Sequence, residues 1–361
     1  MGKKNKKKNK KVQLPFVSVC TPTFNRRPFI PSLIKCYKHQ KYPLDRMEWI
    51  IVDDGTDYVE DLFTNIDIPN VKYIKLDEKI TLGKKRNLMH TFCKGDIIVY
   101  MDDDDYYPPT RVSHAVEKLV ANPKALAAGS SEMYIYFKNI NKMYQFGPYG
   151  PNHATAGTFA FKKELLDQTS YNEDKCLAEE KEFLKGFTIP FVQLEPKHVI
   201  LVFSHSHNTC DKSKLITDEN NAGFRLSNKT VADFIKETEL YEWFTNKIDI
   251  ELNNYEPGLP KHKPDVLKQL AEFEERIRQR NKSLTPDVGI TIQRKGKPPI
   301  KLNQDQVVKL LQEQQNKIKE LMMQNKRLQS LCQSQQDRLS ELTNPNMKDH
   351  ITQAANITTF S

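Results

Sequence analysis

An apolar stretch followed by four adjacent aspartates constrains the fold of this chain more than any other feature. Residues 97–101 read Ile-Ile-Val-Tyr-Met, and Asp102 to Asp105 follow directly. A short continuous apolar stretch is typical of a buried parallel strand, and ligands of open α/β sheets bind beyond the carboxyl ends of such strands. Neighbouring carboxylates repel one another, so a bound cation would offset their charge. An acidic, solvated loop is the alternative interpretation.

Two earlier stretches repeat this pattern of apolar residues followed by polar ones. Residues 17–20 precede the sequence TPTFNR, and residues 49–52 precede two aspartates and a glycine. Between the stretches, residues 29–40 and 82–92 have apolar residues at helical spacing. Alternating strands and helices predict right-handed crossovers and a mostly parallel sheet. We therefore expect the three polar strand ends to meet at one end of the sheet.

Four segments together resemble the nucleotide-sugar half of glycosyltransferase family 2. They are VSVCTPTFNR from residue 17, WIIVDDG from residue 49, GKKRNL from residue 83 and GDIIVYMDDDD from residue 95. Each segment alone is a weak signal, whereas four in the same order and spacing are specific. The resemblance covers about residues 15–210. It implies an α/β fold with a single Rossmann-like nucleotide-sugar-binding domain of the glycosyltransferase A type, in which an Asp-x-Asp motif holds a divalent metal.

The resemblance implies that residues after the first two strands hold the nucleotide. Thr21 and Pro22 would cradle the base. Asp53 would accept a hydrogen bond from a ring N–H of the base, with Asp54 close by. An ionised carboxylate accepts but cannot donate, which favours a uridine nucleotide. A simple turn before Gly55 is the alternative role for the two aspartates.

Basic residues at the start of the second predicted helix are candidates for contacts with phosphate or ribose. Lys84, Lys85 and Arg86 follow a glycine at a helix start, where backbone N–H groups and positive side chains attract anions. Of these, Lys84 and Arg86 are the expected donor ligands. A solvated basic helix face is the alternative.

The resemblance also implies a metal at the acid cluster. Asp102 and Asp104 align with the Asp-x-Asp pair, and Asp103 would lie beside the nucleotide. The alignment can shift by one residue because the run is all aspartate. His205 would complete the metal or diphosphate shell, with His207 as the alternative, and both also fit as structural histidines. Oxygen ligands together with diphosphate match Mn²⁺ or Mg²⁺.

Glycosyl transfer also needs a base that takes the proton of the acceptor hydroxyl. The sequence AEEKEFL from residue 178 resembles the family motif that carries this base, although the family usually has Glu-Asp there. Glu180 is the predicted base, with Glu179 as the second choice. An acidic first helical turn that complements the helix dipole is the non-catalytic alternative.

Composition bears on location and partners. Seven lysines and no acidic residue in residues 1–11 account for most of the net charge of +9, leaving about +2 for the rest. A basic tail of residues 1–13 is expected to be disordered, and a nucleic-acid partner is not favoured. No signal peptide and no apolar stretch of the roughly 18 residues that a membrane helix needs are visible, and six scattered cysteines suit a reducing compartment. A soluble, cytoplasmic protein is expected, and the lysine- and asparagine-rich composition is typical of AT-rich genomes such as those of parasites and large viruses.

We place the catalytic domain at residues 14–215. The carboxyl-terminal part of the chain lies beyond the resemblance. Helical patterning over 221–243 and 265–282 predicts a helical extension, residues 216–283, that could close over the acceptor. Residues 284–301 read as a linker rich in proline, glycine and lysine. Residues 344–361 are expected to be a disordered tail.

Residues 302–343 predict a coiled coil. The heptad a positions are Leu311, Ile318, Asn325, Cys332 and Leu339, and the d positions include Val307, Leu321, Leu328 and Leu342. An asparagine at an a position favours a parallel dimer in fixed register, so we expect a homodimer. A lone amphipathic helix packed against the catalytic domain is the alternative.

The principal interpretation is a metal-dependent, non-processive glycosyltransferase that moves a sugar from a nucleotide-sugar donor, a UDP-sugar, to a hydroxyl of a glycan, protein or lipid. Inversion at the sugar follows from the resemblance alone. A catalytically silent scaffold that acts through its coiled coil is the alternative. The intact set of Asp53, Asp102, Asp104 and Glu180 argues against it. A nucleotidyltransferase would usually carry a glycine-rich, basic signature near the first strand, which is absent.

Overall fold

The structure is a computed structural model that describes residues 13–177, 179–208, 212, 216, 223–284, 290–293, 299–302 and 304–343. The chain divides into two compact units, residues 1–274 and residues 275–361. In the part of the chain that the structure describes, no helix is both long enough and apolar enough to cross a membrane. The two predicted tails, residues 1–13 and 344–361, lie outside the described residues except for residue 13.

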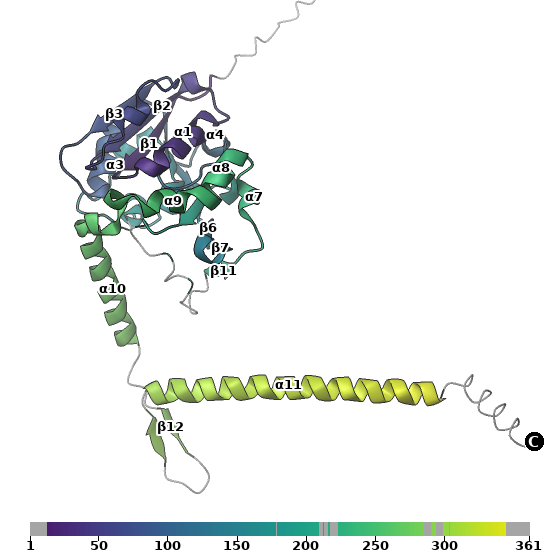
Figure 1. Cartoon of the computed structure of the whole chain (residues 1–361). Helices are drawn as coiled ribbons and strands as arrows, with labels where there is room; N and C mark the ends of the chain where they lie inside the picture. The colour runs from purple at the N-terminus through teal and green to yellow at the C-terminus, as the bar shows by residue number, and fades with distance from the viewer. Residues whose placement is uncertain are drawn as a thin grey trace, which may run out of the picture. The chain divides into compact units, whose positions relative to one another are not determined.

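A seven-stranded sheet forms the centre of the first unit, in the order β3-β2-β1-β4-β8-β5-β9. Figure 1 labels β1, β2 and β3 of this sheet. Its strands are β1 (Val17–Thr23), β2 (Met47–Asp53), β3 (Val71–Lys75), β4 (Ile97–Tyr100), β5 (Ala127–Gly129), β8 (Ala160–Lys162) and β9 (Phe191–Gln193). β1 runs parallel to β2 and β4, and β2 runs parallel to β3. β8 is antiparallel to β4 and β5, so the sheet is mixed. The predicted parallel arrangement is confirmed for β1, β2 and β4.

Both faces of this sheet are buried, which explains the continuous apolar stretches. Alternate residues of a strand point to opposite faces. Trp49 and Ile51 belong to one apolar cluster, with side chains of α1 (Ile30–Lys38) and α4 (Arg111–Ala121). Ile50 and Val52 belong to another, with side chains of α3 (Leu82–Phe92) and α5 (Glu180–Phe183). The helices predicted over residues 29–40 and 82–92 are confirmed as α1 and α3.

A second, four-stranded sheet has the order β10-β6-β7-β11. It consists of β6 (Met133–Phe137), β7 (Lys142–Phe146), β10 (Leu201–Ser204) and β11 (Phe224–Leu226). Tyr106, just after the acid cluster, forms an antiparallel bridge with Leu201. Asp105 Oδ1 accepts a hydrogen bond from the backbone N–H of Phe203 at 3.1 Å. β10 is therefore attached directly to the end of the acid cluster, and the loop after β10 carries His205.

The extension is helical only in part. The helix predicted over residues 221–243 is wrong, because the structure has β11, α7 (Val231–Phe234) and α8 (Thr238–Glu242) in the described part of that range. β11 pairs with β7, and a capping box between Thr230 and Asp233 starts a new helix. A π-helical turn, Trp243–Lys247, and α9 (Ile248–Asn253) follow. The next helix, α10 (Pro264–Leu284), confirms the helix predicted over residues 265–282.

The second unit contains a hairpin and a long helix. β12 (Ile290–Ile292) and β13 (Ile300–Leu302) pair antiparallel inside the stretch expected to be only a linker. Short β-branched segments around a turn-forming stretch explain this pairing. α11 (Gln304–Thr343) follows, and its a and d side chains Leu311, Ile318, Leu321, Leu328 and Leu339 are all more than half exposed. The helix is confirmed, while the coiled coil stays a prediction.

Thr21 joins three neighbouring strands inside the sheet. Its hydroxyl donates to the carbonyl oxygen of Met101 at 2.7 Å and accepts from Trp49 Nε1 at 2.9 Å. Its side chain is completely buried, and the Trp49 indole stacks on Tyr37 with ring centroids 4.3 Å apart. The hydroxyl expected to face the base is thus engaged within the core.

Thr21→Val should lower the free energy of unfolding by about 1–3 kcal/mol, because the indole N–H of Trp49 would stay buried without its acceptor. Urea unfolding followed by tryptophan fluorescence measures the change. Thr91→Val is the matched control, since the exposed Thr91 hydroxyl donates only to a carbonyl in its own helix. An equal effect of the two substitutions would contradict the assigned role of Thr21.

Candidate functional site

The three polar strand ends meet at the carboxyl end of β1, β2 and β4, as the sequence predicted. A pocket of about 200 Å³ lies there, and it is strongly charged. Its lining residues are Pro22, Thr23, Phe24, Arg26, Leu82, Lys85, Arg86, Asp102, Asp103, Asp104 and Lys263. The acid cluster is therefore part of a partly enclosed pocket, rather than a solvated loop.

Lys85 connects α3 to the end of β2. Its ammonium forms a buried ion pair with Asp54 and donates to the carbonyl oxygen of Thr23 at 2.9 Å. Burial lowers the pKa of Lys85, and the charge of Asp54 opposes that shift. Lys84 is exposed and does not line the pocket, because successive helical residues point about 100° apart. The structure thus brings Lys85 to the pocket in place of the expected Lys84.

Asp53 is engaged in shaping the loop after β2. Its carboxylate accepts from the backbone N–H of Gly55 at 2.9 Å, from that of Val59 at 3.1 Å and from the Tyr73 hydroxyl at 2.6 Å. Asp53 is only 1% exposed and does not line the pocket. The turn-forming alternative therefore describes what Asp53 does in this structure, and little acceptor capacity is left for a base.

Arg86 holds two acidic side chains from different elements. Its Nε lies 3.1 Å from Glu179 Oε1, and its Nη2 lies 3.7 Å from Asp102 Oδ1. The guanidinium also lies over the ring of Tyr100 at 4.4 Å. Burial alone would lower the pKa of Arg86, but Asp102 and Glu179 outweigh it and raise that pKa. Arg86 is therefore a fixed cation that positions both acids.

Arg26 offsets the negative charges of two further aspartates of the acid cluster. Its guanidinium lies 3.6 Å from Asp103 and 3.5 Å from Asp104. Burial raises the pKa of Asp103 to about 7, with Arg26 opposing. Burial would also raise the pKa of Asp104, but a hydrogen bond with His205 and the charge of Arg26 hold that pKa well below its usual range. Asp104 is thus the acid of this pair that stays ionised.

His205 lies beside Asp104, as predicted for a shared ligand. Its Nε2 is 3.4 Å from Asp104 Oδ2 and 2.8 Å from Asn208 Nδ2. Burial lowers the pKa of His205 to about 4, although Asp104 opposes this. The neutral imidazole is therefore the main form at neutral pH. Its Nδ1 accepts from the backbone N–H of His207 at 3.2 Å, so Nε2 carries the proton here, and binding a metal through Nε2 requires the other tautomer. His207 points elsewhere, with its Nε2 at 2.6 Å from the carbonyl oxygen of Tyr255.

These donors fit a divalent ion that takes its remaining ligands from a substrate. Among the described residues, no three His, Cys, Asp or Glu side chains converge as a complete metal site. Two ligands in neighbouring positions around Mg²⁺ or Mn²⁺ lie about 3 Å apart, close to the 3.4 Å between Asp104 Oδ2 and His205 Nε2. Asp102 Oδ1 is buried and has no hydrogen-bond partner. A site with one or two carboxylates, completed by substrate phosphates, is typical of Mg²⁺.

Glu179 and Glu180 lie at the start of α5 and have different environments. Glu179 is 4% exposed and is paired with Arg86. Burial, and then the charge of Glu179, raise the pKa of Glu180 to about 7, and Arg86 opposes the shift. A carboxyl group with a pKa near neutrality is suited to proton transfer. This contrast favours Glu180 over Glu179 as a base.

Sequence reasoning did not select Arg26 or Lys263 as site residues. Arg26 lies within the first family-like segment, so its place after a strand end was a signal. Lys263 lies in the extension, far from the acid cluster in sequence, and no local pattern marks it. Only folding brings it to the pocket.

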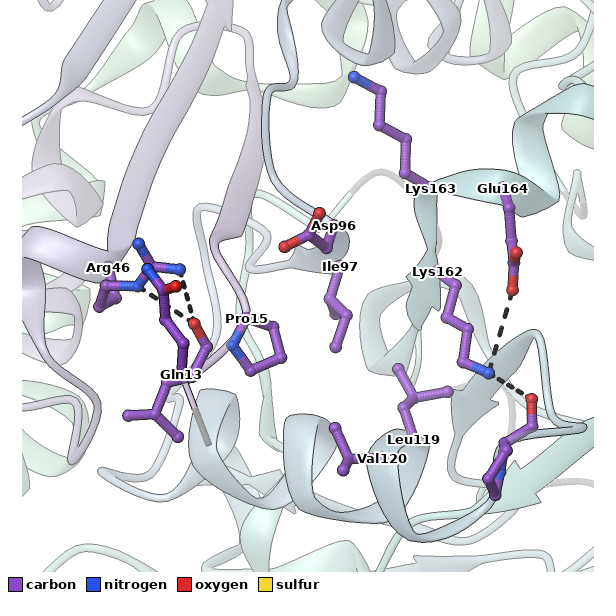
Figure 2. Close-up of a pocket in the computed structure, with 12 residues that line it drawn as sticks. Gln13, Pro15, Arg46, Asp96, Ile97, Leu119, Val120, Lys162, Lys163 and Glu164 are labelled. Atoms are coloured by element: carbon purple, nitrogen blue, oxygen red, sulfur yellow. Dashed lines mark hydrogen bonds and ion pairs between the residues drawn. The ribbon is translucent and has the colours of Figure 1, made fainter. Parts of the chain in front are cut away.

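A larger hollow, of about 680 Å³, lies at the opposite end of the sheet, near the amino ends of β1 and β4 (Figure 2). Its charged groups are occupied within the chain. Arg46 donates to the carbonyl oxygen of Leu14 at 2.6 Å, and Lys162 donates to that of Pro123 at 2.6 Å (Figure 2). This hollow therefore has fewer features of a catalytic site than the smaller acidic pocket.

The match to a known protein family includes the same segments of the chain. Residues 18–182 match the model of glycosyl transferase family 2. The predicted resemblance is confirmed for this stretch, which we call the family 2 region. It contains Asp53, Asp54, the acid cluster, Arg86 and the Glu179–Glu180 pair. His205 and Lys263 lie beyond it.

The curated relatives match over short stretches. The putative colanic acid biosynthesis glycosyl transferase WcaA of Escherichia coli (strain K12) is 33% identical over 102 residues, 27% of this chain and 36% of the relative. Undecaprenyl-phosphate 4-deoxy-4-formamido-L-arabinose transferase of Pseudomonas syringae pv. syringae (strain B728a) is 30% identical over 112 residues, 29% of this chain and 32% of the relative. The matched part of the chain spans about a third of the length of these relatives.

Solved structures are more distant in sequence. The mannosyltransferase PcManGT from Pyrobaculum calidifontis, in complex with GDP-Man and Mn2+, is 17% identical, with a TM-score of 0.44, over 73% of this chain and 81% of that chain. A crystal structure of S. aureus TarS 1-349 is 19% identical, with a TM-score of 0.41, over 52% of this chain and 60% of that chain.

Proposed function

We propose that this chain is a metal-dependent glycosyltransferase that moves a sugar from a nucleotide-sugar to an acceptor hydroxyl, with inversion at the sugar. The observation that carries the proposal is the family 2 region, whose Lys85, Arg86 and Asp102 to Asp104 line one charged pocket, with Glu179 attached to that pocket through Arg86. The names of the curated relatives support this class of activity. A UDP-sugar is the proposed donor on the ground of the resemblance, since the hydrogen bonds of Asp53 within its own loop give no separate support for a base contact. The proposed acceptor is a glycan, protein or lipid.

Asp104 and His205 are the proposed metal ligands, with Asp102 close by. When bound, Mn²⁺ or Mg²⁺ would supply positive charge that stabilises the departing nucleoside diphosphate. Arg26 keeps Asp103 and Asp104 in place. Arg86 does the same for Asp102 and Glu179. These ion pairs orient the ligands before the substrate arrives, which reduces the reorganisation that binding requires.

Glu180 is the proposed base. Its carboxylate would accept the proton of the acceptor hydroxyl while the hydroxyl oxygen bonds to the anomeric carbon and the nucleoside diphosphate leaves from the opposite side. Glu179 stays paired with Arg86. Its proposed role is to hold Arg86 in place, and it does not accept the proton. A single base is sufficient for an inverting transfer.

Asp104→Ala should abolish divalent-dependent binding of a nucleoside diphosphate, because the substitution removes the ionised ligand. Isothermal titration calorimetry with UDP and with GDP, each with Mn²⁺ and with chelator, measures this loss. Asp67→Ala, at an exposed position outside the pocket, is the control. Equal affinity with and without chelator in all three proteins would remove the metal from the mechanism.

Glu180→Gln should lower the rate of sugar transfer by about 10²-fold or more and leave donor binding unchanged, because the amide cannot accept the proton. In the wild type, the rate should rise as the pH passes through about 7, since the ionised carboxylate is the active form. Glu179, Arg86 and Tyr171 are the charged and titratable groups that act on Glu180. The measurement is a pH profile of sugar transfer, with donor hydrolysis as the assay until an acceptor is found.

The exposed Glu182→Gln, in the same helix, is the control for the base. An inactive Glu179→Gln together with an active Glu180→Gln would move the base by one residue. A wild-type protein that binds nucleotide but transfers and hydrolyses no donor would favour the scaffold alternative.

The proposed partner of α11 is a second copy of this chain. Its exposed apolar side chains repeat every 3.5 residues on average, and one helix alone cannot bury such a stripe. In a parallel, in-register dimer, Cys332 would lie opposite Cys332 of the other copy, and this cysteine is exposed.

The double substitution Leu321→Asp and Leu328→Asp should convert a dimer into a monomer in light scattering, since it places charges in the apolar seam. Asn316→Asp with Ser330→Asp adds the same charge at outer heptad positions and should leave the dimer intact. Mild oxidation of the wild type should give a covalent dimer that Cys332→Ser does not form. A wild type that is monomeric at micromolar concentration would exclude the coiled coil.

A further inference from the structure

A lysine of the extension forms part of the wall of the acidic pocket. Lys263 lines the pocket together with Asp103 and Asp104, although it lies well outside the family 2 region. Its ammonium is 5.6 Å from the centre of the Phe24 ring. Burial and the charge of Arg26 lower the pKa of Lys263 to about 7, and the charges of Asp103 and Asp104 oppose that shift. A basic side chain from a different part of the chain therefore faces the acid cluster.

The segment around Lys263 is attached to the pocket on both sides. Before it, Asn25 Nδ2 donates to the carbonyl oxygen of Pro257 at 2.9 Å, and Arg26 Nη1 donates to that of Gly258 at 3.2 Å. After it, Asp265 forms an ion pair with Lys79 at 2.5 Å. A Cβ atom added to Gly258 would lie 2.7 Å from the His207 ring, so this segment packs closely on the loop after β10. These contacts hold Lys263 at the pocket.

The charge balance of the pocket gives this lysine a role. Arg26, Lys85 and Arg86 each hold carboxylates, and the charge of Lys263 interacts with Asp103 and Asp104. A nucleoside diphosphate would add at least two further negative charges to the pocket. Divalent metal offsets part of this charge, and an ammonium group with three donors suits the remaining phosphate oxygens.

We propose that Lys263 binds the diphosphate of the nucleotide and thereby makes the extension part of the donor site. This inference rests on the proposed function, because it assigns a ligand contact within the same pocket. The donor site then extends beyond the family 2 region, to the segment between α9 and α10.

The test compares UDP with UMP, and GDP with GMP, by calorimetry in the presence of Mn²⁺. Lys263→Gln should raise the dissociation constant of the diphosphate about tenfold, the loss typical of one charged hydrogen bond. The monophosphate should be affected much less, so the ratio of the two constants should change. Lys263→Arg keeps the positive charge and should retain affinity within about threefold.

Lys261→Gln is the matched control. Lys261 lies in the same segment, its side chain is 62% exposed, and it pairs with Glu256 outside the pocket. Thermal unfolding of each variant, followed by circular dichroism, confirms that it is folded. If Lys263→Gln is unfolded, Lys263→Met carries the same comparison, because it keeps the length of the side chain and removes only its charge.

The outcomes separate this inference from the proposed function. A wild type that binds neither diphosphate with Mn²⁺ would overturn both. A wild type that binds, with a folded Lys263→Gln that binds equally well, would overturn the role of Lys263 alone. Equal weakening of diphosphate binding and monophosphate binding would also overturn it, because a general structural effect of the substitution would weaken both alike. Where Lys263→Met replaces Lys263→Gln, a ratio unchanged from the wild type would overturn the role as well.

Discussion

Compensation of buried carboxylates by buried cations determines the organisation of the pocket. Asp54 pairs with Lys85, Asp102 and Glu179 lie against Arg86, and two further aspartates lie against Arg26. Removing one partner of a buried pair leaves an uncompensated charge, which is strongly destabilising. The positions of β2, β4, α3 and α5 at the pocket are therefore linked through these side chains.

Two adjacent residues of α3 illustrate how this linkage works. Lys85 reaches the end of β2, while Arg86 reaches the acid cluster after β4 and the start of α5. Their different directions follow from the helical rotation between successive residues. One helix thus joins three elements, and its packing on the sheet fixes both cations before any ligand is present.

The parts of the site that lie far apart in the sequence depend on the sheet for their placement. Tyr106 forms the bridge that carries β10, and β10 leads to His205. The extension then reaches the first strand loop through hydrogen bonds from Asn25 and Arg26. The family 2 region supplies the acids and Arg86, and the segments after it supply His205 and Lys263. A boundary drawn at the end of the family match would divide this pocket.

The sequence by itself determined β1, β2, β4, α1 and α3, and the meeting of the polar ends of these three strands. Buried parallel strands and amphipathic helices leave local patterns, and the carboxyl ends of parallel strands necessarily lie at one end of a sheet. Tertiary structure decided which charged side chains face the pocket. It turned Lys84 outward and Lys85 inward, engaged Asp53 in its own loop and brought Lys263 to the acid cluster. Such choices depend on contacts between residues far apart in the chain, which no local pattern encodes.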